Sequence, residues 1–272
     1  MTRIDDEAQA RERERARRAA DWQTDARRVR RVRVFRDAAI DETRWPATIP
    51  AVRAFLRVAG GEGWEFSPGV TFLVGENGSG KSTLLEGIAE AVGLPAEGGS
   101  TNGGRASAGI ESPLGEWLRV EHGLASSRWG FFLRAETMHG YYSYLEDLAE
   151  FGSPDPSYHR MSHGESFNTI LSEKLDPERF VTGLALLDEP EAGLSFTSLL
   201  SWLSALDRMR ARGTQVICAT HSPILTSLPG ATILELGDWG IREAAWGELQ
   251  LVDHHCRFLD APERYLRHLL AE

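Results

Sequence analysis

The sequence contains little cysteine and no long apolar run. Cys218 and Cys256 are its only cysteines, too few for a disulfide framework and without metal-ligand spacing. No segment approaches the roughly eighteen apolar residues that a membrane-spanning helix needs, and the N-terminus is charged. These absences predict a reduced, cytoplasmic protein without membrane insertion.

Charge is distributed unevenly along the 272 residues, which carry a formal net charge of −10. Residues 1–36 hold twelve arginines and seven acidic residues, a basic arm of the kind that binds nucleic acid or a protein partner. The alternating segment 11–15 is equally typical of a solvated helix or a frayed end. Nucleic-acid binding therefore stays open. We expect residues 1–28 to form a polar extension, partly helical or disordered, and residues 29–272 to form one α/β domain.

A glycine-rich stretch predicts a phosphate-binding loop. Residues 75–82 fit the pattern G-x-x-x-x-G-K-[ST], and Lys81 is one of only two lysines among 30 basic residues. Glycines let the backbone approach a polyphosphate, Lys81 can reach the β- and γ-phosphates, and the Ser82 hydroxyl can ligate Mg²⁺. The expected nucleotide-binding residues are Gly75, Glu76, Asn77, Gly78, Ser79, Gly80, Lys81, Ser82 and Thr83.

The surroundings of this loop support that interpretation. An apolar strand is predicted over 70–74, and apolar residues at helical spacing follow from Leu84 to Ala89. The positive end of that helix would face the phosphates. A strand, the loop and a helix in this order are the context that the motif requires.

A second apolar strand ends in two acids, Asp188 and Glu189. The carboxyl ends of parallel strands meet at one edge of a sheet, so both carboxylates are expected beside the phosphate loop. Asp188 would hold Mg²⁺ opposite Ser82, and Glu189 would orient and polarise the attacking water. His221 ends the next predicted strand and could contact the γ-phosphate.

The remaining pattern alternates strands with helices, which favours a mainly parallel, right-handed sheet. Further strands are predicted at 29–35, 116–120, 129–134, 181–187, 215–219 and 231–236. Helices are predicted at 162–174, where Ser162 and Glu165 form a capping box, at 195–210, where Leu199, Leu200, Leu203 and Leu206 have core spacing, and near 260–270. Segment 51–56 is a short helix or extended, 97–104 a flexible connection, and 137–160 a surface helix and loop.

Several separated motifs resemble those of one family. Residues 75–83, 184–189 and 219–223 resemble the Walker A, Walker B and switch-histidine motifs of ABC-class ATPases. Segments 130–136, 162–166, 188–195 and 262–270 resemble the small stand-alone bacterial ATPases labelled AAA-family or ABC-type cytosolic ATPases, which are related to the ATPase heads of chromosome-maintenance, recombination-repair and defence proteins. The resemblance implies a P-loop NTPase fold with a mainly parallel central sheet, an antiparallel N-terminal β part and a small inserted helical segment at about 137–175.

The resemblance also implies how nucleotide is bound. ATP and Mg²⁺ would lie between two subunits of an ATP-dependent homodimer, with Ser162 and Gly164 of one subunit facing the γ-phosphate held by the other. His163 and Glu165 depart from the usual signature. Glu136 or Arg134 would take the place of the glutamine that contacts Mg²⁺ and water.

The function expected from these residues is hydrolysis of ATP, coupled through dimer closure to an unidentified protein partner. Three alternatives stay open: the nucleotide-binding subunit of a membrane transporter, a P-loop kinase or GTPase, and a regulatory nucleotide binder that does not hydrolyse. The altered signature fits a transporter subunit poorly, and the sequence has no guanine-reading Asn-Lys-x-Asp segment.

Overall fold

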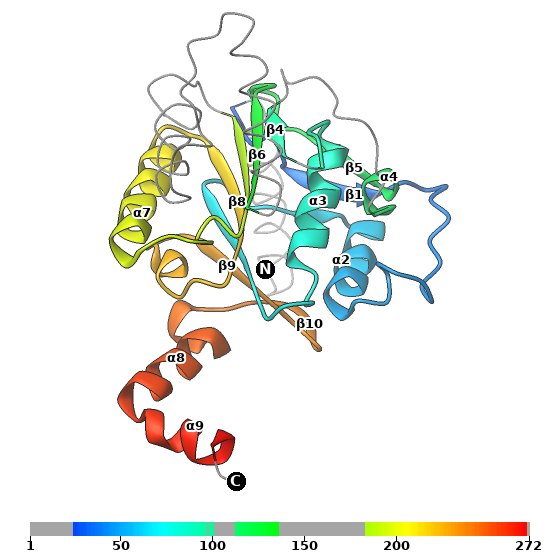
Figure 1. Ribbon diagram of the computed structural model, residues 1–272. Helices are drawn as coiled ribbons and strands as arrows, with labels where there is room; N and C mark the ends of the chain where they lie inside the picture. The colour runs from blue at the N-terminus through cyan, green and yellow to red at the C-terminus, as the bar shows by residue number, and fades with distance from the viewer. Residues whose placement is uncertain (1–23, 97, 101–111, 136–182, 271–272) are drawn as a thin grey trace, which may run out of the picture.

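Figure 1 shows the computed structural model, which describes residues 24–96, 98–100, 112–135 and 183–270. Within this part of the chain, a central sheet stands between helices on its two faces (Figure 1). One face is covered by α3 (Lys81–Ala91) with α2 (Pro50–Gly60) beyond it, and the other by α7 (Phe196–Ala211). The predicted α/β class with flanking helices is confirmed.

The central sheet of the described residues has seven strands, in the order β10-β9-β3-β8-β7-β6-β4. The five inner strands are parallel, and the two edge strands are antiparallel to their neighbours. In that order the strands are Gly240–Glu243, Thr232–Gly237, Val70–Val74, Gln215–Thr220, Leu184–Asp188, Gly130–Arg134 and Gly99–Ser100. Because β8 lies between β3 and β7, the ends of three strands that carry candidate residues meet at one edge.

The core is divided by the alternating side chains of the buried strands. Leu73, Leu186 and Ile217 pack with the apolar side chains of α3 in one cluster. Their neighbours Phe72 and Leu187 pack in a second cluster with residues of α7. Each strand therefore joins both helical layers, which fixes the register of its carboxyl end.

A small antiparallel sheet confirms the predicted N-terminal β part. Its order is β2-β1-β5, with bounds Trp64–Glu65, Arg31–Val34 and Leu118–Glu121. The expected inserted helical segment at 137–175 lies outside the described residues.

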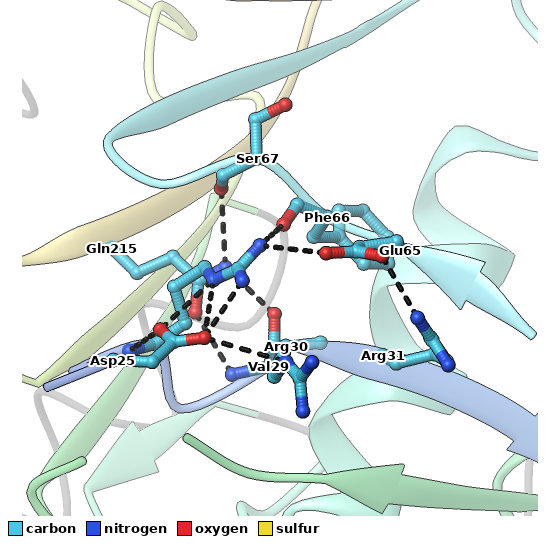
Figure 2. Close-up of polar contacts among 9 residues, drawn as sticks. Asp25, Val29, Arg30, Arg31, Glu65, Phe66, Ser67 and Gln215 are labelled. Atoms are coloured by element: carbon cyan, nitrogen blue, oxygen red, sulfur yellow. Dashed lines mark hydrogen bonds and ion pairs between the residues drawn. The ribbon is translucent and has the colours of Figure 1, made fainter. Parts of the chain in front are cut away.

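Polar contacts hold the start of this β part, and those of Gln215 attach it to the central sheet (Figure 2). The Gln215 side chain accepts a hydrogen bond from Val29 N and donates one to Val29 O, both at 2.8 Å. Arg27 donates to Phe66 O at 2.6 Å and pairs with Asp25 at 2.7 Å. Residues 27 and 29, on either side of the expected start of the domain, therefore both make hydrogen bonds to it.

Some predicted elements differ from the observed ones. Glu116 and Trp117 belong to the short helix α4 (Leu114–Trp117), and only then does strand β5 begin. Gly99 and Ser100, which were expected in a flexible connection, form an edge strand that pairs with β6. Because this pairing uses only backbone groups, it leaves no side-chain pattern in the sequence. In α7, Leu200 is exposed, and Trp202 takes the central core position.

The C-terminal region has more structure than predicted. After β9 the chain forms strand β10, helix α8 (Gln250–Asp260) and helix α9 (Pro262–Leu269), of which only the last was expected. Two single 3₁₀ turns lie at Leu225–Ser227 and Trp246–Glu248. Figure 1 shows that α8 and α9 extend from the end of the sheet where the carboxyl end of β3 lies. Among the described residues, no helix has the length and apolarity needed to cross a membrane.

Candidate functional site

The phosphate loop has the backbone conformation that its glycines were expected to supply. Gly78 and Gly80 have φ angles of 80° and 96°, which other residues adopt only with strain. A Cβ on Gly75 would stand 2.5 Å from the carbonyl oxygen of Leu236, so only glycine fits there. Helix α3 begins at Lys81, directly after the loop, and its free N–H groups face the loop.

Lys81 is 4 % exposed and folds back over the loop. Its Nζ donates hydrogen bonds to Gly75 O at 2.9 Å and to Glu76 O at 3.0 Å. Burial lowers its pKa, while the nearby carboxylates of Glu189, Asp188 and Glu191 act in the opposite direction. A cation held in this way is positioned to exchange a carbonyl partner for a phosphate oxygen.

The predicted pair of magnesium ligands is brought together. The Ser82 hydroxyl donates to Asp188 Oδ1 at 2.9 Å, although the two residues are 106 positions apart in the sequence. Asp188 ends the buried strand β7 and is itself 4 % exposed. A hydroxyl and a carboxylate are oxygen ligands of the kind that Mg²⁺ prefers, so these residues fit the ion. No group of three or more metal-ligating His, Cys, Asp or Glu side chains occurs in the described ranges.

Arg134 lies on the other side of Asp188, paired with it in register at the end of β6. Its Nε is 3.7 Å from Asp188 Oδ2, and its Nη2 is 2.7 Å from Glu86 Oε1. All three residues are buried. The guanidinium therefore neutralises two carboxylates beside the candidate magnesium position. Glu136, the other residue expected here, lies outside the described residues.

Glu189 and His221 also meet. His221 Nε2 is 3.0 Å from Glu189 Oε1, although the contact lacks hydrogen-bond geometry. Glu189 has a φ of 49°, the only positive value among the described residues other than glycine, and its backbone N–H donates to Ala219 O at 2.9 Å. Strained backbone of this kind recurs at functional sites because it fixes the direction of a side chain.

Glu191 is a site residue that the sequence analysis did not select. Its carboxylate accepts hydrogen bonds from the Thr220 hydroxyl and from the His221 backbone N–H. Burial raises its pKa, the two hydrogen bonds lower it, and the charge of Glu189 raises it further. Through these hydrogen bonds, Glu191 connects the loop after β7 to the segment that contains His221. In the sequence it was marked only by its place in the family-like segment 188–195, two residues after Glu189.

The expected site residues divide into two groups. Lys81, Ser82, Asp188, Glu189 and His221 converge at the carboxyl ends of β3, β7 and β8, with Thr83 in the first turn of α3. The signature residues Ser162 and Gly164 lie outside the described residues.

Comparisons with known proteins agree with the loop assignment. The model of the AAA domain family matches residues 49–117, a range that contains the phosphate loop and α3. The comparison with curated proteins found no match.

Solved structures give similarity of fold only. One, described as an inward-facing conformation of a metal-chelate type ABC transporter, is 15 % identical with a TM-score of 0.40, covering 69 % of this chain and 76 % of its own. Another, cbiO1 from Clostridium perfringens, part of the ABC transporter complex cbiONQ, is 16 % identical with a TM-score of 0.42, covering 76 % and 90 %. Because these TM-scores are low, the fold class here follows from the strand order and the loop geometry.

Proposed function

We propose that this protein is a magnesium-dependent ATPase of the ABC class. The observation that carries the proposal is the 2.9 Å contact between Ser82 and Asp188, because it sets a magnesium-ligand pair directly beside a phosphate loop. The match of residues 49–117 to the AAA domain family supports it.

The phosphate loop and Lys81 would bind the β- and γ-phosphates of ATP. Backbone N–H groups of residues 76–82 and the dipole of α3 favour the negative charge, and Lys81 supplies a cation that is already desolvated. Ser82 and Asp188 would hold Mg²⁺, which when bound neutralises charge that develops on the phosphate oxygens.

Glu189 would act as general base in hydrolysis. Its carboxylate would accept a proton from a water molecule while the water oxygen forms a bond to the γ-phosphorus. The bond from that phosphorus to the β–γ bridging oxygen then breaks, releasing ADP and phosphate. His221, whose Nε2 is 3.0 Å from Glu189 Oε1, would donate a hydrogen bond to a γ-phosphate oxygen.

Closure would bring a second subunit over this site. Ser82, Glu189 and His221 are each partly exposed, so the edge of the sheet where the γ-phosphate would lie is open to a partner surface. The expected contributors from that second subunit are Ser162 and Gly164. ATP-dependent homodimerisation would then be coupled to an unidentified protein partner, in DNA maintenance or in defence.

The test is Glu189→Gln, which retains the shape of the side chain and removes the base. We expect light scattering with Mg²⁺ to show a doubling of mass only when ATP is added, and phosphate release to fall by about 10²-fold or more. Glu243→Gln, at an exposed position on β10, is the matched control and should behave like the wild-type protein. Wild-type turnover by the Glu189 variant would remove this residue from the mechanism.

A further inference from the structure

A cavity of about 660 Å³ opens beside the phosphate loop. Its wall is formed by residues 75–79, by the turn after β9 and by one side of α8, with Tyr265 of α9 and His221 also contributing. Ser82, Asp188 and Glu189 are not among the described residues that line it. Its volume lies within the range of about 300–1,000 Å³ that is typical of small-molecule sites.

The sheet order gives the direction in which a nucleotide would lie. Asp188 is at the end of β7, which is separated from β3 by β8, whereas β9 is the neighbour of β3 on the opposite side. A γ-phosphate placed toward Ser82 and Asp188 leaves the nucleoside on the β9 side of the loop. The cavity occupies that side.

The charge of the cavity suits a nucleoside better than a polyphosphate. Its wall contains the carboxylates of Glu76, Glu235 and Asp238, and no lysine or arginine is present among its described lining residues. Glu235 is already neutralised, because its Oε2 is paired with Arg242 and its Oε1 accepts the Gln250 N–H at 2.9 Å. Asp238 directly follows the carboxyl end of β9, and an acid at such a position can accept hydrogen bonds from ribose hydroxyls.

Trp239 and Gln250 provide contacts for a planar base. Trp239 is 48 % exposed, and its ring is held by the Arg242 guanidinium, 4.7 Å from the ring centroid, and by packing over Gly237. The exposed part of this indole lines the cavity, and an aromatic ring that is held in place provides a contact surface for a base. Gln250 is exposed at the start of α8, and its amide carries one donor group and one acceptor, the pair that matches an adenine edge.

We propose that this cavity binds the nucleoside of the nucleotide, with the base of a purine stacked on Trp239 and hydrogen-bonded by Gln250. The inference rests on the proposed function and adds to it a second subsite, built by the β9–β10 turn and the C-terminal helix α8. The C-terminal region is thereby assigned to substrate binding.

The test compares ATP with inorganic tripolyphosphate as ligands of the full chain in Mg²⁺, by calorimetry. Both probes use the phosphate loop, but only ATP has a nucleoside. We expect Trp239→Ala to weaken ATP binding by roughly 5- to 100-fold and to leave tripolyphosphate binding unchanged. Gln250→Ala should weaken ATP binding selectively in the same way, and it changes an exposed side chain that the fold does not need.

The matched control is Trp45→Ala, because Trp45 is 50 % exposed and does not line the cavity. The inference is overturned if both cavity variants bind ATP as tightly as the wild-type protein, or if only Trp45→Ala weakens it. It is also overturned if ATP and tripolyphosphate bind the wild-type protein equally well. A wild-type protein that binds neither probe contradicts the proposed function itself.

Discussion

The Thr220 hydroxyl donates a hydrogen bond to the Glu191 carboxylate at 2.7 Å, which joins the end of β8 to the loop after β7. The same carboxylate accepts the backbone N–H of His221. One partly buried acid thus holds the backbone of the candidate catalytic residue His221 to the loop that carries Glu189, and it touches neither nucleotide nor water in the proposed reaction.

This arrangement predicts a pH-dependent stability. Burial raises the pKa of Glu191 above its usual value of 4.5. At pH values between 4.5 and this raised pKa, the folded protein therefore binds more protons than the unfolded chain. The free energy of unfolding should therefore fall as pH rises through that window. Glu191→Gln retains the acceptor oxygen for Thr220 and His221 and removes the titration.

Urea denaturation of both proteins at a series of pH values from 4.5 upward checks this sign. The variant should gain stability relative to the wild-type protein as pH rises, and the difference should level off above the raised pKa. Parallel profiles for the two proteins would show that the buried carboxyl does not titrate in this range.

Arg134 predicts a second effect on stability. Its guanidinium is 2.7 Å from Glu86 and 3.7 Å from Asp188, and all three are buried. Arg134→Leu removes a cation shared by two carboxylates, which should lower the free energy of unfolding by roughly 3–5 kcal/mol. Replacing Glu86 as well, in Arg134→Leu with Glu86→Leu, should recover part of that loss, because the Glu86 carboxylate is then removed together with its cation, whereas Asp188 has still lost Arg134.

Thermal or urea denaturation of the two variants measures this coupling. Arg119→Leu, at an exposed position on β5, is the control and should change stability little. A single variant as stable as the wild-type protein, or a double variant no better than the single one, would contradict the role given to the guanidinium.

Local patterns predicted the residues that depend on neighbouring sequence. The loop glycines, Lys81 and the helix after it follow from an eight-residue motif, and fully buried strands such as 70–74 follow from continuous apolar runs. The meeting of Asp188 with Ser82 was predicted from the rule that carboxyl ends of parallel strands share an edge, and the 2.9 Å contact agrees with it.

Relationships set by tertiary structure were not predictable in this way. Leucine spacing assigned Leu200 to the core, but the buried face of α7 runs through Leu199, Trp202 and Leu206, and Leu200 lies beside it and is exposed. The insertion of β8 between β3 and β7 has no local signal, and therefore neither has the contact of Glu191 with Thr220. Helix α8 was missed because Val252 is its one buried residue, so it lacks the repeated core positions by which α7 was predicted.

The final prediction concerns the attachment of the N-terminal β part. The Gln215 side chain is 2 % exposed and satisfies both backbone groups of Val29, which is fully buried. Gln215→Leu has similar volume but leaves a buried N–H and a buried C=O without this partner, at a cost of about 1–3 kcal/mol for each.

We expect a lower free energy of unfolding and faster hydrogen exchange at the Val29 amide, measured by denaturation and by mass spectrometry. Gln250→Leu, which changes an exposed glutamine, controls for the substitution itself. Unchanged exchange at Val29 would show that other contacts hold this segment, whereas a change confined to Gln215→Leu would show that the Gln215 side chain holds Val29 to the central sheet.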